Sequence, residues 1–180
     1  MNRREFLKSG TILGAVFAVT GFSIGSACSA QTRATGENKP PADSRTDDLP
    51  FEKVKKSDAE WKKILTPEQF RVTREAGTEK PYSSPLNDEK RKGTFVCVGC
   101  EFPLFSSEHK FDSETGWPSF YKPIKEINVA EKTDKSLGMV RTEVLCHRCD
   151  AHLGHVFDDG PEPTGLRYCI NGVAMKFVKA

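Results

Sequence analysis

Six cysteines fall into three kinds by their spacing along this 180-residue chain. Four of them form two C-x-x-C pairs, Cys97 with Cys100 and Cys146 with Cys149. Cys169 stands apart from both pairs, and Cys28 closes an apolar N-terminal stretch. Because thiolates bind soft metal ions and act as nucleophiles, this spacing predicts a metal site, a candidate nucleophile and a processing site.

The two C-x-x-C pairs can present four sulfurs to one ion, and a tetrahedral four-thiolate site suits Zn²⁺. Between Cys100 and Cys146 lie 45 residues, so the metal would join distant hairpins rather than build one small finger. A single pair could instead be a redox dithiol, and an exported protein could form two disulfides. Two pairs favour metal, and a closed site favours a structural role. We expect one structural Zn²⁺ per chain.

Two interpretations of Cys169 compete: an inert buried residue and a nucleophile. A lone cysteine in a strand is more often an inert apolar residue than a nucleophile. Arg167 and Asn171, however, lie two residues to either side and would share its face of a strand, where a guanidinium favours the thiolate. Two imidazoles and a carboxylate come shortly before: His152, His155 and Asp159. Since histidines can act as general acids near neutral pH, the segment could do proton transfer beside a thiol.

Short β-like runs separated by turn residues follow residue 87 and would carry these side chains. They predict a mainly β, antiparallel domain with a short helical N-terminal cap. The expected strands are Gly93–Val98, Pro103–Phe105, Ile127–Ala130, Met139–Cys146, His155–Asp158, Leu166–Ile170 and Val173–Val178. Asn171-Gly172, between the last two, predicts a β-hairpin.

Two capping boxes predict the helices of the cap, one from Ser57 to Glu60 and one from Thr66 to Gln69. Pro67 would occupy the first position of the second helix, and Gly77 would be the residue that follows its C-cap. The apolar residues expected to pack into the core are Trp61, Ile64, Leu65, Phe70 and Val72.

The N-terminus is typical of an export signal. Two arginines, Arg3 and Arg4, precede residues 10–27, which carry no charge. The pattern resembles a twin-arginine signal, and the stretch is too rich in Gly, Ser and Thr to favour the alternative of a membrane-spanning anchor. We expect a removable signal over residues 1–27. Cys28 would then be either the acylated first residue of a lipoprotein or part of an ordinary cleavage site ending at Ala30.

Residues 28–49 are polar and are expected to form a disordered tether, which leaves residues 50–180 as one domain. Residues 1–27 hold three of the 27 basic and one of the 25 acidic residues, so 24 of each remain after them. A chain of zero formal charge argues against nucleic-acid binding. The expected location is the periplasm, with the protein either free or anchored to the membrane as a lipoprotein.

Four motifs, in order and at the spacing of one family, cover most of residues 53–179. They are Gly116–Phe120, Cys146–Phe157, Asp159–Pro161 and Arg167–Asn171. This set resembles the B-type peptide-methionine (R)-S-oxide reductases. The resemblance implies a β-rich, tent-like domain with zinc on the two C-x-x-C turns.

By the same resemblance, Cys169 attacks the sulfoxide sulfur and becomes a sulfenic acid. His152 and His155 match the histidines expected to protonate the sulfoxide oxygen. Three polar residues are expected to orient these groups: Asp159, Arg167 and Asn171. Trp117 matches the residue that receives the substrate methyl group, and Phe120 is expected to extend that pocket.

One position departs from the family. Many members have a resolving cysteine two residues before the tryptophan of Gly-Trp-Pro, where this chain has Thr115. The disulfide with Cys169 that the family usually forms is therefore excluded. We expect a one-cysteine cycle, in which an external thioredoxin-like thiol reductant reduces the sulfenic acid directly.

Two other function classes compete with this one: a non-catalytic zinc-stabilised module that binds a partner, and a thiol–disulfide oxidoreductase that uses a C-x-x-C pair. A binding module has no need of a cysteine, an arginine and two histidines in this arrangement. Bound zinc would remove both pairs from redox chemistry. The sequence favours a reductase for methionine-R-sulfoxide, free or within proteins.

Overall fold

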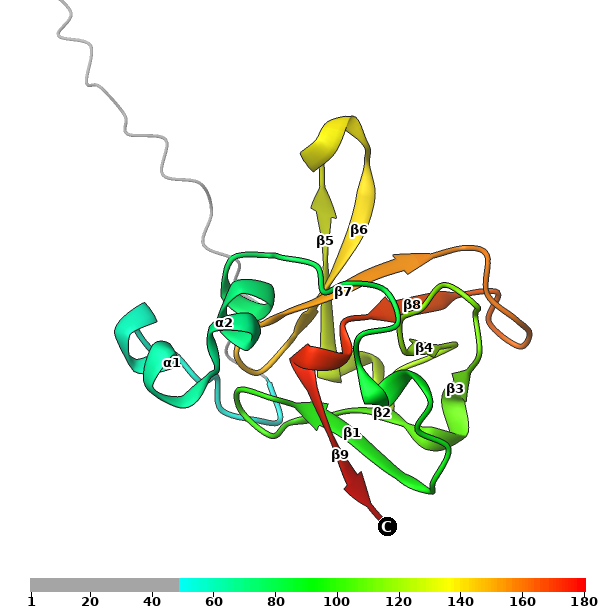
Figure 1. The fold of residues 1–180 in the computed structure, drawn as a ribbon, viewed down its shortest axis with the longest axis horizontal. Helices are drawn as coiled ribbons and strands as arrows, with labels where there is room; N and C mark the ends of the chain where they lie inside the picture. Colours follow the sequence, from blue (N-terminus) through cyan, green and yellow to red (C-terminus); the bar gives the residue numbers. More distant parts are fainter. Residues whose placement is uncertain (1–48) are drawn as a thin grey trace, which may run out of the picture. The chain divides into compact units, whose positions relative to one another are not determined.

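Two antiparallel sheets and two short helices make up residues 49–180, the part of the chain that this computed structural model describes (Figure 1). The predicted signal, Cys28 and the predicted tether up to residue 48 lie outside the described residues. The prediction of a mainly β, antiparallel domain with a short helical N-terminal cap is confirmed. Among the described residues, no helix combines the length and apolar character needed to cross a membrane.

The larger sheet has six strands in the order β3-β4-β8-β7-β6-β5. Their bounds are Lys110–Phe111 (β3), Ser119–Phe120 (β4), Arg167–Ile170 (β8), His152–Phe157 (β7), Arg141–Cys146 (β6) and Val129–Asp134 (β5). The sequence did not predict β3 and β4, which have only two residues each. It also placed the start of β7 three residues too late, and so left His152 outside the strand.

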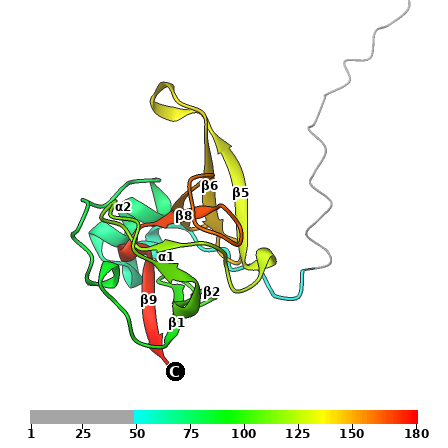
Figure 2. The same cartoon turned by 90° about the vertical axis from the view of Figure 1, so that its right-hand side faces the viewer.

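The smaller sheet has the order β2-β1-β9 and lies apart from the larger one in Figure 2. Its strands are Pro103–Ser106 (β2), Gly93–Cys97 (β1) and Met175–Lys179 (β9). The predicted hairpin at Asn171-Gly172 is wrong, because β9 pairs with β1 rather than with β8. The chain forms a 3-10 turn over Gly172–Ala174 and crosses to the other sheet. The carboxylate of Glu79 accepts hydrogen bonds from the backbone amides of Gly172 and Val173, at 2.6 and 2.9 Å. These two bonds fix the turn.

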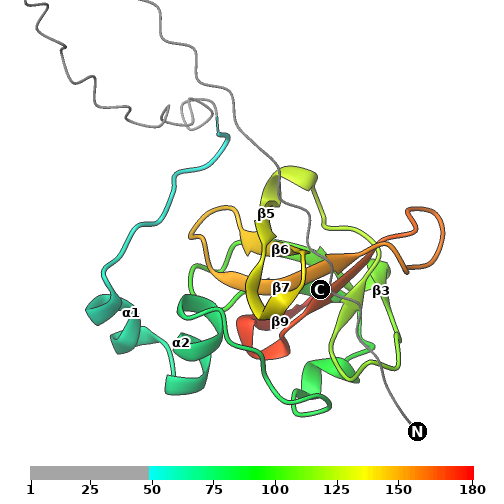
Figure 3. The ribbon, with the colours of Figure 1, turned by 90° about the horizontal axis from the view of Figure 1, so that it is seen from above.

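The helices α1 (Asp58–Ile64) and α2 (Pro67–Arg74) lie to one side of the sheets (Figure 3). Both predicted capping boxes are present, because Ser57 and Thr66 accept amide hydrogen bonds and their partners three residues later reach back. Four of the five predicted core residues are buried: Trp61, Leu65, Phe70 and Val72. Ile64 was predicted wrongly, since 57% of it is exposed.

The end of α2 differs from the prediction at Gly77. The residue in the left-handed region is Ala76, with a φ of 52°, so Gly77 does not take the role expected of it. Gly77 instead lets the chain pass close to α2, where its amide donates to the carbonyl of Arg71 at 3.1 Å. A side chain there would collide with the same carbonyl, so the glycine is required for close approach.

An aromatic cluster fills the space between the two sheets. The rings of Phe105 and Phe120 stack with their centroids 4.5 Å apart, and Phe95 meets Phe120 edge-on at 5.0 Å. Tyr168, on β8, joins the cluster from the six-stranded sheet. Since Tyr168 is next to Cys169, the core fixes the backbone that carries the candidate nucleophile.

Candidate active site and metal centre

Strand pairing brings three segments distant in sequence to one place. On β8, Cys169 lies opposite His155 of β7 and opposite Ser119 of β4. Trp117 comes two residues before Ser119. Side chains on directly opposed residues of antiparallel strands point to the same face, so the thiol and the imidazole face the same side of the sheet.

A bulge in β7 brings the second histidine to this face. Residues three apart on a regular strand point to opposite faces. The register of β7 against β6 shifts by one residue at Leu153, and this extra residue restores His152 to the side of His155. The two imidazole centroids are 5.5 Å apart. Gly154, within the bulge, lies so close to the carbonyl of Cys169 that a side chain would clash with it.

A cavity of about 160 Å³ opens at Cys169. It brings together four of the predicted site residues: Trp117, His155, Cys169 and Asn171. Thr78, Arg141 and Phe157 also contribute to its wall, and sequence reasoning missed all three. Thr78 lies in the loop after α2, and Arg141 is the first residue of β6. Neither belongs to a sequence motif.

Asp134 connects His155 to Arg141. Its Oδ2 accepts a hydrogen bond from His155 Nε2 at 2.9 Å and from Arg141 Nη2 at 2.7 Å. Hydrogen bonds from the amide and hydroxyl of Ser136, and then from His155, hold the pKa of Asp134 well below its ordinary range. Because the carboxylate only accepts, Nε2 carries the proton and Nδ1 is the remaining nitrogen of His155. No motif in the sequence marked Asp134, which lies at the far end of β5.

His152 lies behind His155 and does not line the cavity. Only 4% of it is exposed, and its Nδ1 donates to Glu143 Oε1 at 2.7 Å. Burial lowers the pKa of His152, although Glu143 opposes the shift, so this imidazole is neutral near pH 7. His152 therefore supports His155 and does not itself face the cavity.

Asp159 and Arg167 form a pair at the edge of the site. Two hydrogen bonds of 2.8 Å join the guanidinium to the carboxylate, and the guanidinium carbon lies 4.5 Å from the centre of the Phe157 ring. Asp159 itself is exposed and does not line the cavity. The pair therefore fixes the position of the guanidinium near Cys169.

Asn171 lines the cavity while its amide group is held by the backbone, whereas Phe120 belongs to the core alone. Both polar atoms of the Asn171 amide group are hydrogen-bonded to the backbone: Oδ1 accepts from the amide of Glu79 at 2.9 Å, and Nδ2 donates to the carbonyl of Leu153 at 3.0 Å. Phe120, expected to extend the pocket, is completely buried in the aromatic core and is not part of the cavity wall. Its strand points the ring away from Cys169, since its neighbour Ser119 is the residue opposite Cys169.

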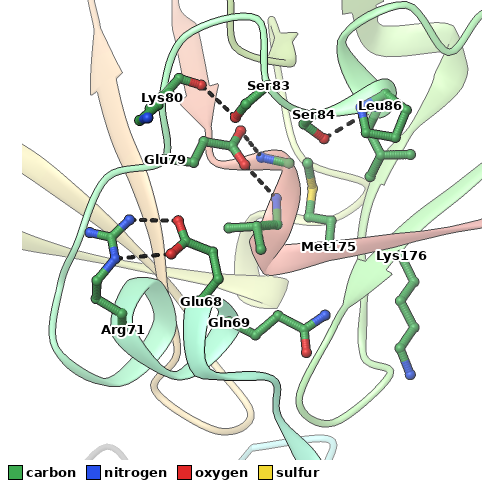
Figure 4. Close-up of a pocket in the computed structure, with 13 residues that line it drawn as sticks. Glu68, Gln69, Arg71, Glu79, Lys80, Ser83, Ser84, Leu86, Met175 and Lys176 are labelled. Carbon is green, nitrogen blue, oxygen red and sulfur yellow. Dashed lines mark hydrogen bonds and ion pairs between the residues drawn. The ribbon is translucent and has the colours of Figure 1, made fainter.

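Glu79 is a further residue that sequence reasoning missed. Its carbonyl accepts from Trp117 Nε1 at 3.3 Å, its amide donates to Asn171, and its side chain holds the turn after β8. It also borders a larger hollow of about 850 Å³, shown in Figure 4. Within residues 49–180, no cysteine or histidine lines that hollow, so the small cavity at Cys169 is the one equipped for thiol chemistry.

The Cys169 thiol is held mainly protonated at neutral pH. Burial raises its pKa, and the nearby Arg167 and Thr115 oppose this shift only in part. The sequence-based expectation that Arg167 favours the thiolate has the right sign, but burial has the larger effect. Deprotonation must accompany the reaction.

We expect alkylation of Cys169 by iodoacetamide to accelerate with a midpoint at higher pH than that of a cysteine in an unfolded peptide. Arg167→Gln should move the midpoint further upward, because it removes a charge that stabilises the thiolate. The rate is measured by mass spectrometry of the Cys169 peptide. Arg91→Gln, in the loop before β1 of the other sheet, is the matched control and should not move it. A midpoint at or below that of the free peptide would contradict the burial argument.

The four remaining described cysteines form one cluster. The sulfurs of Cys97 and Cys149 are 3.6 Å apart, as are those of Cys100 and Cys146, and all four lie within 4.8 Å of one another. A tetrahedral ion with sulfur ligands at about 2.3 Å requires sulfur–sulfur separations of about 3.8 Å, which these positions fit. None of the five cysteines in residues 49–180 is in a disulfide, so the disulfide alternative is not what the structure shows.

The two turns that carry the cluster are built alike. In each, the carbonyl of the first cysteine accepts a hydrogen bond from the amide four residues later. Cys97 accepts from Glu101 at 2.9 Å, and Cys146 accepts from Asp150 at 2.8 Å. These two residues have φ angles of 59° and 57°. One turn follows β1 and the other joins β6 to β7, so a metal ion would tie the small sheet to the large one. The prediction that the site joins distant hairpins is confirmed.

A small cavity that brings together a cysteine, a histidine and a tryptophan, on a β domain with a cluster of four cysteines able to hold a metal ion, is the arrangement expected of an enzyme that uses a cysteine in oxidation–reduction chemistry. The SelR domain model matches residues 65–179. Relatives named peptide methionine sulfoxide reductase MsrB include one from Hahella chejuensis, 57% identical over 130 residues, which are 72% of this chain and 94% of that protein. One from Pseudomonas putida is 56% identical over 127 residues, covering 71% and 96%. A third, from Leptospira interrogans, is 56% identical over 126 residues, covering 70% and 96%.

The chain therefore belongs to the MsrB family of peptide methionine sulfoxide reductases, and it is an enzyme that reduces methionine sulfoxide. The resemblance inferred from the four motifs is confirmed.

Proposed function

We propose that this enzyme reduces methionine-R-sulfoxide, free or within proteins, with Cys169 as the nucleophile. The observation that carries the proposal is the shared cavity of Cys169, His155 and Trp117. Its volume, about 160 Å³, suits the end of one methionine sulfoxide side chain. The indole wall fits the S-methyl group, since sulfur–aromatic contacts are favourable by about 0.3–1.5 kcal/mol.

Selectivity between the two sulfoxide epimers is expected from this arrangement. With the methyl group against Trp117 and the sulfur at Cys169, one of the two epimers directs its oxygen toward His155. The other directs its oxygen away from the only imidazole in the described part of the cavity wall. Discrimination between epimers is expected to be large, because the sulfoxide oxygen is a poor leaving group until it is protonated.

Proton transfer is assigned to His155. Asp134 accepts from Nε2, which leaves Nδ1 to hold or give the transferred proton. The Asp134 carboxylate thus fixes the tautomer and the orientation of the His155 ring. His152, supported by Glu143, packs behind His155 and keeps its ring in place.

The proposed chemical step transfers oxygen from the sulfoxide to Cys169. The Cys169 sulfur attacks the sulfoxide sulfur, the oxygen takes a proton, and the S–O bond of the substrate breaks as oxygen passes to Cys169. The products are methionine and a Cys169 sulfenic acid, so the substrate is reduced by two electrons and the cysteine is oxidised by two. Arg167 lies close enough to favour the thiolate that attacks.

An external donor is proposed to complete the cycle. Thr115 Oγ1 lies 4.0 Å from the Cys169 sulfur, at the position where the family resemblance leads us to expect a resolving cysteine. Within residues 49–180, no second cysteine lines the cavity. A thioredoxin-like donor would supply two thiols, which restore the Cys169 thiol and leave as a disulfide, with the oxygen released as water.

Thr115→Cys should convert this cycle to an intramolecular one. The 4.0 Å separation at Thr115 needs only a small adjustment to form a disulfide with Cys169. One equivalent of sulfoxide, without added thiol, should give a disulfide between the introduced cysteine and Cys169 that peptide mass spectrometry detects. Thr115→Ser is the matched control and should leave a sulfenic acid that dimedone traps. A Thr115→Cys variant that accumulates the trapped sulfenic acid would contradict the proposed geometry.

We further propose that the metal is Zn²⁺ and that its role is structural. Four cysteine sulfurs are the donors that zinc takes in closed sites, and the separations in the cluster fit its size. Cys169 is not among the four. The metal thus contributes stability to the backbone of the site without taking part in the reaction.

Export is proposed on the N-terminal sequence alone, with the enzyme acting in the periplasm, free or anchored through acylated Cys28. The thiol donor would then also be periplasmic or membrane-bound. Cell fractionation tests this, and full-length protein found only in the cytoplasm would contradict it.

The deciding experiment for the proposed function compares the two epimers of an N-acetylated methionine sulfoxide amide, with dithiothreitol as the reductant. The R epimer should be consumed at least about 100-fold faster than the S epimer, which corresponds to about 2.7 kcal/mol between the two transition states. Equal consumption of both epimers would overturn the assigned cavity geometry.

A further inference from the structure

The β5–β6 hairpin extends beyond the body of its sheet (Figures 1 and 2). The last residue pair of its ladder is Asp134 with Arg141, and a 3-10 turn over Ser136–Gly138 closes the end. The neighbouring strand β7 pairs with β6 only as far as Thr142. Residues 135–140 therefore lie past the end of the three-strand ladder; we refer to them as the hairpin tip.

The tip is directly connected to the active site. Arg141 lines the cavity of Cys169, and Asp134 holds both Arg141 and His155. The two residues that end the ladder are thus part of the site, and the tip begins one residue beyond each of them. Ser136 reinforces this connection, because its amide and its hydroxyl both join the Asp134–Arg141 pair.

The tip presents apolar side chains to solvent. Met139 is 52% exposed and Val140 is 76% exposed. Met139 lies two residues before Arg141 in extended chain, so it shares the face of Arg141, which is the face of the cavity. Val140, one residue further on, lies on the opposite face, where it lines a separate hollow with Thr142 and Val156. Met139 is therefore the apolar side chain that the tip places at the rim of the catalytic cavity.

We propose that the hairpin tip is the docking surface for the polypeptide that carries the methionine sulfoxide. This inference rests on the proposed function and extends it to the substrate class. A cavity of about 160 Å³ holds one side chain, so the residues flanking it must lie outside, along the rim. Met139 offers them a flexible, polarizable contact, which suits a surface that must accept many sequences.

Chemistry also fits this occupant. An enzyme that repairs methionine sulfoxide meets it in many sequence contexts, and a surface that reads side-chain charge would exclude some of them. The charges nearest the cavity side of the tip are internally neutralised, because Asp134 pairs with Arg141 at 2.7 Å. Lys135 is the one charged residue within the tip, and Met139 is its apolar contact on the cavity side. The partner that fits is an extended peptide with apolar residues next to the methionine sulfoxide.

The test compares two substrates of one chemistry. One is N-acetyl-methionine-R-sulfoxide methylamide, which fits the cavity and ends there, and the other is a nonapeptide with central methionine-R-sulfoxide flanked by leucines. In Met139→Ser, kcat/KM for the nonapeptide should fall about three- to tenfold, as expected when partial apolar burial is lost. The value for the blocked residue should be unchanged.

Two variants control this experiment. Val178→Ser removes an equally exposed apolar residue, 52% exposed, from β9 of the other sheet, and should leave both substrates unaffected. Met139→Leu keeps the apolar surface and should retain peptide activity. Unchanged nonapeptide activity in Met139→Ser, or an equal fall for both substrates, would overturn the docking surface. If the unmodified enzyme reduces neither substrate, the proposed function itself fails.

Discussion

Cys169→Ser should lower kcat/KM for methionine-R-sulfoxide by at least about 10⁴-fold, the scale seen when an enzyme loses its nucleophile. The reason is specific to sulfur. A serine hydroxyl is far less nucleophilic at neutral pH than a thiol, and it cannot accept oxygen to form a sulfenic acid. The measurement is the rate at which the blocked R-sulfoxide is converted to the blocked methionine at low substrate concentration, monitored by chromatography.

The chain offers its own matched control for this substitution. Cys28→Ser removes the other cysteine outside the metal cluster and should leave turnover with dithiothreitol unchanged, because Cys169 is reset by an external thiol. Residual activity above about 1% in Cys169→Ser would contradict its role as the nucleophile. A Cys28–Cys169 disulfide in the unmodified enzyme after one turnover would contradict the one-cysteine cycle.

Loss of the metal should have the largest effect on stability. Structural Zn²⁺ binds cysteine sites with about 10–16 kcal/mol at pH 7, which equals or exceeds the net stability of about 5–15 kcal/mol typical of a domain. Here the site joins the turn after β1 to the turn between β6 and β7, so its loss would separate the two sheets. Cys146→Ser should lower the Tm by more than about 10 °C, or prevent folding.

The readouts for this prediction are metal content and thermal unfolding measured on the same samples. The unmodified enzyme should contain one zinc per chain, and Cys146→Ser substantially less. Cys169→Ser, the same change outside the cluster, should keep the zinc and the Tm. Metal-free protein that unfolds at the same temperature as the zinc-loaded form would refute the structural role.

The Cys169 and Cys146 predictions distinguish loss of the reaction from loss of the fold. The Cys169 variant loses activity with its fold intact, whereas the Cys146 variant loses the fold and activity follows. A chelator should reproduce only the second result. This distinction matters because β7 carries both His155 and, at its start, the turn of the metal cluster, so a loosened cluster would also displace the proposed acid.

Local patterns in the sequence were sufficient for much of the architecture. The capping boxes at Ser57 and Thr66 predicted both helices, because a cap depends on residues within one turn. Alternation and turn residues located most strands. They failed at Asn171-Gly172, where a local turn signal was overridden by Glu79, a residue more than 90 positions away that binds the turn.

The site shows the same division. Spacing alone grouped the metal cysteines, and family motifs selected Cys169, His155 and Trp117, which the structure brings to one cavity. The structure alone showed that a bulge in β7 places His152 behind His155, and that Phe120 belongs to the core. Face and depth depend on strand register and packing, which no single segment specifies.

By itself, the sequence determined which residue types are available for chemistry, and it placed a threonine at position 115, on which the proposed external donor rests. Tertiary structure decided how those residues are held. Asp134, Arg141 and Glu79 have no motif around them, and they gain their roles only when β5, β6 and the loop before β1 meet β7 and β8. Side chains act through distances in space, and those distances are set by the pairing of strands far apart in the chain.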